Sequence, residues 1–300
     1  MTAMKSARLV AMKCLKMHGC GNGILLVDRA WLPVDAERLP TLARLVCDRR
    51  KSLGGDTLVV FDPSSPTGEV SVEFWNADGS EGELCINGLR CLAATLVHLH
   101  PARFLRGEWN TAVCESVGEV GVRATDLEWG EATFRPQTLD IHPLGLTHSL
   151  LRPGDRTTFV DLGNPHLIVE LAPGTDDRSG HPLNLAKALH DHEGLPKPCN
   201  VHIVRRSFGD GVDALPWERG VGPTQSCGSG AAAIAAVLAQ RAELPGPAVV
   251  RMPGGELTVH FERPAGTFTV SGRVAFVSIG HAAIRVTDTL DLRPQRAEAE

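Results

Sequence analysis

The strongest constraint on the fold is a motif that occurs twice. The segments CINGLRCLAA, which begins at Cys85, and CGSGAAAIAA, which begins at Cys227, both fit the pattern C-x-x-G-x-x-x-[LI]-A-A. The two cysteines are 142 positions apart (227 minus 85). Because apolar residues at helical spacing follow each cysteine, each segment predicts a helix with a cysteine at its start.

Other residues repeat at the same offset. Asn22 and Asn164 each follow a glycine and are also 142 positions apart. Asn76 and Glu218 have this separation too, and each precedes its cysteine by nine residues. Three matches at one offset indicate an internal duplication, and a duplication decides the fold more strongly than local propensity does.

The remaining sequence predicts an α+β protein. Short β-rich runs such as TLVVFD, TTFVDL and TFTVSGRVAFVSIG are bounded by Gly, Pro, Asp or Asn, which indicates strands. Helices are expected at about 38–50, 88–99, 184–192 and 228–241. We therefore expect two pseudo-symmetric lobes, each a curved, mostly antiparallel sheet wrapped around a central helix.

The lobes have expected bounds. Residues 1–130 form the N-terminal lobe with Cys85, and residues 131–275 form the C-terminal lobe with Cys227. A C-terminal strand around 276–290 is expected to complete the first lobe. The charged tail, 291–300, has no apolar pattern and is expected to be disordered.

Composition excludes several classes of function. The net charge is −5 with no basic stripe, which gives no support for a nucleic-acid partner. Apolar runs fall short of the roughly 20 residues that span a bilayer, and no signal peptide is recognised, so we expect a cytoplasmic protein without a membrane partner. The eight cysteines contain no CxxC pair, so we expect free thiols and no metal site. A homodimer is compatible with the sequence.

A cysteine at a helix start can be a reactive group. The helix N-terminus lowers the pKa of a thiol and offers unpaired amides to an anion such as a carboxylate. Glycines at 88, 228 and 230 are expected to let a ligand approach the backbone. A single cysteine of this kind is more often a buried apolar residue, but two in symmetric positions favour chemistry.

Two opposed thiols fit one reaction especially well. A carbon that bears a hydrogen is inverted when one group removes the proton from one face and another returns a proton to the opposite face. A thiolate and a thiol can exchange these roles, and no pyridoxal lysine or dinucleotide motif is recognised. We therefore expect a cofactor-independent reaction.

Several motifs together resemble the diaminopimelate epimerase family. They are KMHGCGN, FWNADGSEGELCINGLRCLA, LGNPH, CNVHIV, WERGVGPTQSCGSGAAA and MPGGEL, in an order and spacing that extend over roughly residues 12 to 285. The resemblance implies a cofactor-independent isomerase that converts LL-2,6-diaminopimelate into meso-diaminopimelate, in lysine and peptidoglycan precursor synthesis. It also places the start of related chains near Met12, so residues 1–11 are expected to be an extension or an artefact of the assigned start.

The resemblance also implies a role for each matching residue. Cys85 and Cys227 are the acid–base thiols, with Glu218 and His166 beside the reacting centre. The amides of Ile86, Asn87, Gly228 and Ser229 hold the reacting carboxylate. The far end of this small amino-acid substrate, with its own amino and carboxylate groups, is held by Asn22, Asn76, Asn164, Asn200 and Arg219.

Some residues depart from the family pattern. Ile86 replaces a usual glycine, and its β-branched side chain is expected to crowd the carboxylate site or to oppose a positive φ. Thr57, Pro223 and the pair Gly23-Ile24 also differ from the usual residues. Two alternatives therefore stay open: a related racemase of another amino acid, and a catalytically silent member of the fold. Asn76 and Asn164 could also serve turns alone, and Glu218 and Arg219 a surface ion pair.

Overall fold

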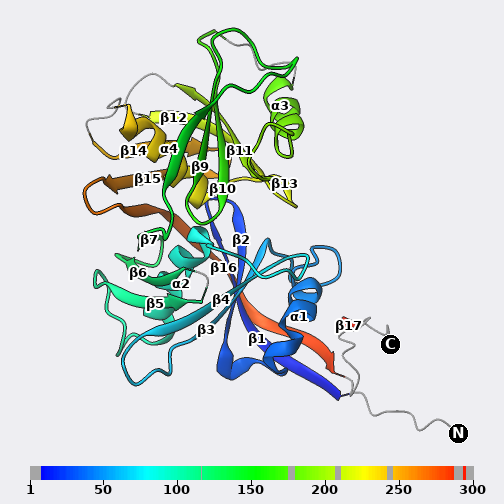
Figure 1. The fold of residues 1–300 in the computed structure, drawn as a ribbon. Helices are drawn as coiled ribbons and strands as arrows, with labels where there is room; N and C mark the ends of the chain where they lie inside the picture. Colours follow the sequence, from blue (N-terminus) through cyan, green and yellow to red (C-terminus); the bar gives the residue numbers. More distant parts are fainter. Residues whose placement is uncertain are drawn as a thin grey trace, which may run out of the picture.

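A computed structural model describes residues 8–115, 117–174, 180–206, 211–241, 246–286 and 293–294. The chain forms two lobes, one above the other (Figure 1). The helices described in the lower lobe are α1 (Leu39–Val46) and α2 (Ile86–Leu99), with the short 3-10 helices η1 (Arg29–Trp31) and η2 (Ala36–Arg38). Its strands are β1 (Arg8–Gly19), β2 (Asn22–Asp28), β3 (Thr57–Asp62), β4 (Val70–Asn76), β5 (Asn110–Cys114), β6 (Gly118–Ala124) and β7 (Trp129–Phe134).

The upper lobe repeats this order of elements. Its helices are α3 (His181–Leu189) and α4 (Gly228–Gln240). Its strands are β8 (Asp140–Leu144), β9 (Arg156–Asp161), β10 (Pro165–Glu170), β11 (Asn200–Arg206), β12 (Gly211–Glu218), β13 (Gly222–Pro223), β14 (Ala248–Met252) and β15 (Gly255–Glu262). The long β16 (Thr267–Val286) and the short β17 (Arg293–Pro294) end the described chain.

Strand pairing confirms the predicted α+β fold with two pseudo-symmetric lobes. In the lower lobe β2 pairs in parallel with β3, and β4 with β5. In the upper lobe β10 pairs in parallel with β11, and β12 with β14. The other pairings between strands are antiparallel, and both lobes use them in matching places, such as β3 with β4 and β11 with β12.

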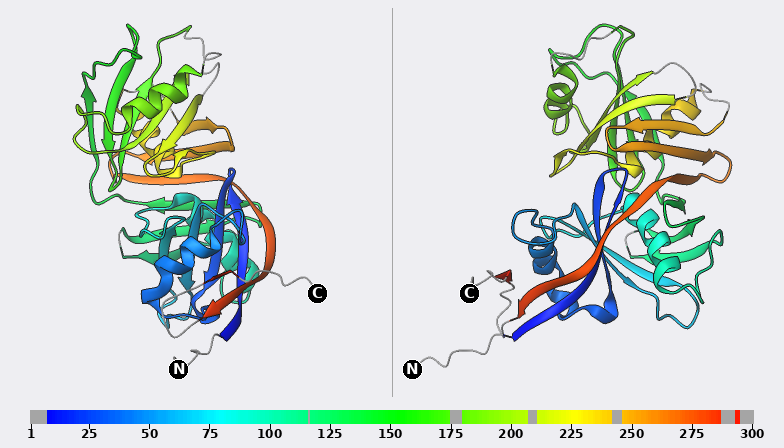
Figure 2. Two further views of the ribbon diagram at one scale, coloured as in Figure 1. Left: turned by 90° about the vertical axis from the view of Figure 1, so that its right-hand side faces the viewer. Right: turned by 180° about the vertical axis from the view of Figure 1, so that it is seen from behind.

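One strand crosses between the lobes. The first part of β16 pairs with both β15 and β7, and its later part pairs with β1 from Gly19↔Val274 to Arg8↔Val286 (Figure 2). Residues 8–11, part of the expected extension, thus lie within a paired strand. The lobe boundary expected at residues 130–131 falls within β7, so we propose the linker at 135–139. Of the tail expected to be disordered, only Arg293–Pro294 lies within the described residues.

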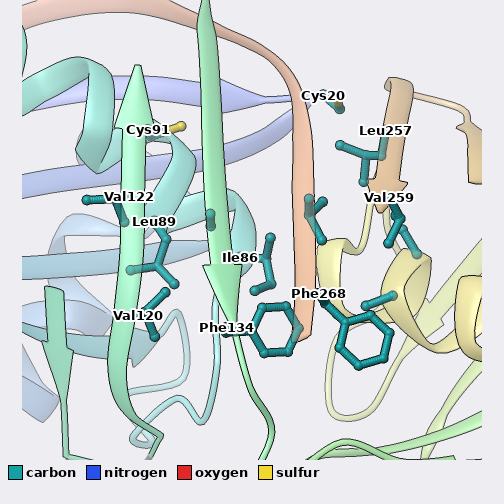
Figure 3. Packing of buried hydrophobic residues seen from close by; sticks show 14 of the residues in the cluster. Cys20, Ile86, Leu89, Cys91, Val120, Val122, Phe134, Leu257, Val259 and Phe268 are labelled. Atoms are coloured by element: carbon teal, nitrogen blue, oxygen red, sulfur yellow. The ribbon is translucent and has the colours of Figure 1, made fainter. Parts of the chain in front are cut away.

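The core is continuous through both lobes. Helix α4 is apolar on all sides and is buried from Gly228 to Leu238, as an alanine-rich helix must be when sheet surrounds it. Helix α2 is buried from Ile86 to Val97. Figure 3 shows side chains of one cluster that joins α2 to strands of both lobes, with the rings of Phe134 and Phe268 stacked at 5.5 Å. The described residues include no helix that could span a membrane.

Glycines set how closely the central helices approach their surroundings. A Cβ on Gly88 would lie 3.1 Å from Cγ2 of Val59, and one on Gly230 would lie 2.1 Å from Cε1 of His202. These two glycines therefore face strand side chains, and the expectation that they admit a ligand was wrong. Gly228 faces the other central helix, because a Cβ there would lie 2.6 Å from Cβ of Ile86.

The contact between Ile86 and Gly228 explains the departure at residue 86. Ile86 is the first residue of α2 and is buried, so its backbone is helical and needs no positive φ. Its side chain occupies space that the missing side chain of Gly228 leaves. The two helix N-termini are therefore in direct contact across the pseudo-two-fold axis.

This contact predicts a coupled effect on stability. Gly228→Ala should lower the free energy of unfolding by about 1–3 kcal/mol, because a methyl group is forced against Ile86. The same substitution should cost clearly less in an Ile86→Gly background, where the obstacle is absent. Chemical denaturation of the four proteins in the cycle measures the coupling. Gly145→Ala is the matched control, since no atom lies within 4 Å of its added Cβ. Equal costs of Gly228→Ala in both backgrounds would contradict the helix contact.

Candidate active site

Two cysteines cap the two central helices. Cys85 is the N-cap of α2, and its sulfur accepts a hydrogen bond from the amide of Gly88 at 3.3 Å. Cys227 is the N-cap of α4, and its sulfur accepts from the amide of Gly230 at 3.4 Å. The positive end of each helix dipole therefore lies at a sulfur, where it stabilises negative charge.

Both cysteines line one cavity between the lobes, with a volume of about 780 Å³. All but one of the residues predicted for the site also line it: Asn22, Asn76, Ile86, Asn87, Asn164, Asn200, Glu218, Arg219, Gly228 and Ser229. Each lies at or next to the end of a strand, or at the start of a central helix. The remaining predicted residue is His166, which lies fully buried behind this surface and does not line the cavity.

The amides of Ile86, Asn87, Gly228 and Ser229 belong to the first turns of the two helices. Amides in a first turn have no partner within their own helix, so they are available to an anion. Since both helix starts line the same cavity, a carboxylate there would face two sets of donors.

Cys85 is partly buried at the wall of the cavity. Burial raises the pKa of its thiol to about 11, while the Gly88 amide and the hydroxyl of Thr57 act in the opposite direction. The Thr57 oxygen lies 3.9 Å from the sulfur. Thr57 pairs with Ile24 as Asn200 pairs with His166, so it is the counterpart of Asn200, at a separation of 143 rather than 142. The repeat at an offset of 142 therefore does not reveal Thr57 as the counterpart of Asn200.

Cys227 is more completely enclosed, with 5% of its surface exposed. Burial raises the pKa of its thiol far above the usual range, and the charge of Glu218 adds to the shift. The Ser229 hydroxyl lies 3.6 Å from the sulfur and opposes the shift, as does the Gly230 amide. The stability of a Cys227 thiolate therefore depends on the hydrogen bonds that the Ser229 hydroxyl and the Gly230 amide donate to its sulfur.

Glu218 is a half-buried acid that lines the same cavity, close enough to Cys227 for its charge to act on the thiol. Burial raises the pKa of its carboxyl to about 7, although the hydroxyl of Thr224 donates to it at 2.5 Å. A carboxyl with this pKa can hold or release a proton near neutral pH. Glu218 and Arg219 do not pair with each other, since Arg219 pairs with Glu83 at 3.2 Å.

Polar side chains also line the cavity around Arg219. The backbone amide of Arg219 donates to Oδ1 of Asn200 at 2.9 Å, and the Arg219 side chain is 42% exposed. Asn76 lines the cavity, but its side-chain nitrogen donates to the Ser80 hydroxyl at 3.0 Å. This hydrogen bond stabilises the turn that follows β4. Glu83, on the lower lobe, was not predicted and reaches Arg219 on the upper lobe.

His166 connects to the site through a chain of hydrogen bonds. Its Nε2 lies 3.1 Å from Oδ1 of Asn164, and its Nδ1 lies 3.0 Å from Nε2 of His202. Burial lowers the pKa of His166 well below its usual range, and burial lowers that of His202 to about 3. Both imidazoles are therefore neutral.

The described residues contain one group of three side chains of the metal-ligand type. A ring nitrogen from each of His166 and His202 and the sulfur of Cys227 lie within 4.8 Å of one another. The facing nitrogens of the two histidines already form a hydrogen bond with each other. That bond accounts for their approach, and the cluster needs no metal to explain it.

Comparisons with known proteins identify the family of this chain. The sequence profile of the family "Diaminopimelate epimerase" matches residues 14–105 and 158–277. A diaminopimelate epimerase of Methanothermobacter thermautotrophicus is 32% identical over 256 residues, which cover 81% of this chain and 88% of the relative. One from Prochlorococcus marinus is 30% identical over 278 residues, which cover 88% of this chain and 90% of the relative.

Solved structures share the fold at low sequence identity. A hydroxyproline epimerase from Agrobacterium vitis superposes with a TM-score of 0.67 at 16% identity, covering 96% of this chain and 95% of that chain. A PhzF-family phenazine biosynthesis protein from Bacillus anthracis gives 0.66 at 12% identity, covering 91% and 99%. These two likenesses concern the fold alone. The family profile and the curated relatives decide the family, and this chain belongs to the diaminopimelate epimerase family.

Proposed function

We propose that this protein is an isomerase that converts LL-2,6-diaminopimelate into meso-diaminopimelate without a cofactor, a step in lysine and peptidoglycan precursor synthesis. The observation on which this mainly rests is that two thiols, each capping a central helix, line one cavity between two symmetric lobes. Membership of the diaminopimelate epimerase family supports the substrate.

The reaction moves one proton out and one proton in. The substrate α-carbon would lie between the sulfurs of Cys85 and Cys227. The thiolate of one cysteine takes the α-proton, and the C–H electrons are delocalised into the substrate carboxylate. The thiol of the other cysteine then donates its proton to the opposite face, which leaves that sulfur as the new thiolate. The enzyme ends with the two protonation states exchanged, ready for the reverse reaction.

Electrostatics of the helix ends would stabilise the intermediate. Negative charge that develops on the carboxylate falls among the first-turn amides of α2 and α4, which are fixed before the reaction begins. Glu218 would hold the α-ammonium group, and His166 would assist by supporting Asn164 from behind. Arg219 with Asn200 would bind the distal carboxylate, while Asn22 and Asn76 would contact the rest of the distal end.

The first prediction concerns the two sulfurs. Purified protein should interconvert LL- and meso-diaminopimelate without added pyridoxal phosphate or metal, and in deuterated water the product should carry deuterium at the inverted carbon. Cys85→Ala and Cys227→Ala should each lower kcat for epimerisation by about 10²- to 10⁴-fold, because each removes one acid–base group. Cys114→Ala, which changes a buried thiol outside the cavity, is the control. Full activity of either site variant would refute the two-thiol reaction.

The second prediction concerns the substrate. Arg219→Ala should lower kcat/KM for diaminopimelate by about 10- to 100-fold, because a charge-assisted pair with the distal carboxylate is lost. Arg251→Ala is a matched control, since Arg251 is also 42% exposed and paired with a glutamate but lies outside the cavity. If both variants retain the parent rate, the distal role is wrong and other amino acids become the substrates to screen.

The third prediction concerns Glu218 and pH. Its pKa rises from 4.5 in the unfolded chain to about 7 in the fold, so between these values the folded protein keeps a proton that the unfolded chain releases. The free energy of unfolding therefore falls as pH rises through this window. Glu218→Gln should match the parent near pH 4 and exceed its Tm at pH 8 by about 2–4 °C, the shift that about 1 kcal/mol produces.

The control for this experiment is Glu119→Gln, which replaces an exposed carboxylate on β6. Thermal denaturation at the two pH values should show no pH-dependent difference for that variant. A Glu218→Gln variant that gains nothing between pH 4 and pH 8 would mean that Glu218 is not held in a desolvated site.

A further inference from the structure

The proposed reaction uses His166 only as support for Asn164 and gives no role to His202, the second member of this buried pair. Neither side chain is exposed, neither lines the cavity, and their facing nitrogens are 3.0 Å apart. His202 lies on β11, directly under the start of α4, because Gly230 leaves room for its ring. Burying a polar group is costly unless the group is hydrogen-bonded, so the hydrogen bonds of these two rings matter to the fold.

The hydrogen bonds run in one direction, toward Cys227. Nδ2 of Asn164 donates to the Ser229 hydroxyl at 3.1 Å, so Oδ1 of Asn164 faces His166 and accepts from its Nε2. A neutral imidazole protonated at Nε2 has an acceptor at Nδ1. His202 must therefore donate from Nε2, and its own Nδ1, which has no partner among the described residues, is a bare acceptor.

The chain ends at the reacting sulfur. The Ser229 oxygen accepts from Asn164, which leaves the hydroxyl hydrogen of Ser229 for the sulfur of Cys227 at 3.6 Å. A chain of hydrogen bonds thus runs from His202 through His166 and Asn164 to Ser229. It orients the Ser229 hydroxyl so that this group donates to the sulfur of Cys227. A hydrogen bond to a charged acceptor is stronger than one between neutral groups.

Among the described residues of the lower lobe, no such chain of hydrogen bonds leads to Cys85. Ile24 pairs with Thr57 as His166 pairs with Asn200, and Val59 packs on Gly88 as His202 packs on Gly230. Hydrocarbon therefore replaces both histidines under the start of α2. Asn87, the counterpart of Ser229, donates instead to Ser226 at 3.2 Å and accepts from Arg90 at 2.8 Å. The symmetric fold supports its two thiols in different ways.

We propose that His202 is a positioning residue for Cys227 alone: by donating to His166 it fixes the His166 tautomer, the Asn164 amide and the Ser229 hydroxyl, so that this hydroxyl donates to the Cys227 thiolate. The inference rests on the proposed role of Cys227 as an acid–base thiol. It predicts that loss of His202 affects one sulfur and leaves the other unchanged.

The test is thiol alkylation of the full chain by iodoacetamide at pH 8, with Cys85 and Cys227 followed as separate peptides by mass spectrometry. His202→Met removes the donor with little change in side-chain volume, and should slow alkylation of Cys227 about tenfold. Cys85 in the same molecules is the internal control and should change less than about twofold, because hydrocarbon lies under its helix. His202→Gln, whose amide can donate from nearly the place of Nε2, should restore most of the Cys227 rate.

Ser229→Ala removes the last donor of the chain and leaves the histidines in place. It should slow alkylation of Cys227 as much as His202→Met does, and the double variant should be no slower than Ser229→Ala. This comparison remains decisive if His202→Met fails to fold, because Ser229→Ala and His202→Gln still test the two ends of the chain. The assay contains no amino-acid substrate, so its result is independent of whether the protein acts on diaminopimelate.

Three results would overturn the proposal. They are an unchanged Cys227 rate in His202→Met or in Ser229→Ala, an equal slowing of Cys85, and a His202→Gln variant as slow as His202→Met. The first would show that the chain does not reach the sulfur. The second would show a general disturbance of the fold, and the third would show that the donor at Nε2 is not what matters.

Discussion

The contact between the N-termini of the two central helices determines the rest of the site. A Cβ on Gly228 would lie 2.6 Å from Cβ of Ile86, so the helix starts can approach only because one of the two positions has no side chain. That approach places two helix dipoles, two sets of free amides and two capping sulfurs at one cavity. Sheet surrounds both helices, and close packing resists their separation.

The pseudo-symmetry of the lobes places the two cysteines in equivalent positions, and residues that break the symmetry give the two thiols different surroundings. Each sulfur accepts from the amide three residues further on, which is a symmetric feature. The partners beyond that amide differ, with Thr57 near Cys85 and Ser229 near Cys227. In the proposed reaction the two thiols would act on opposite sides of a chiral carbon, so their surroundings have no reason to be identical.

Much of this arrangement could be predicted from the sequence, because it depends on local signals. The repeated Cys-x-x-Gly before an apolar run marks both helix starts, and the offset of 142 indicates the two lobes. What could not be predicted depends on pairing between distant strands. His202 reaches His166 only through the register of β10 and β11, and Thr57 matches Asn200 at an offset one residue longer. The sequence predicts that the side chain of Ile86 obstructs the carboxylate site, whereas in the structure this side chain packs against the start of α4 at Gly228.

The central claim, that the two sulfurs face opposite sides of one substrate carbon, is tested most directly by hydrogen exchange in single-cysteine variants. Cys85→Ala and Cys227→Ala, each incubated in deuterated water with pure LL- or meso-diaminopimelate, can still remove an α-proton with the thiol that remains. Each variant should exchange that proton in one of the two isomers only, without inversion, and the two variants should prefer opposite isomers. Exchange of the same isomer by both variants, or of both isomers by either, would contradict the account.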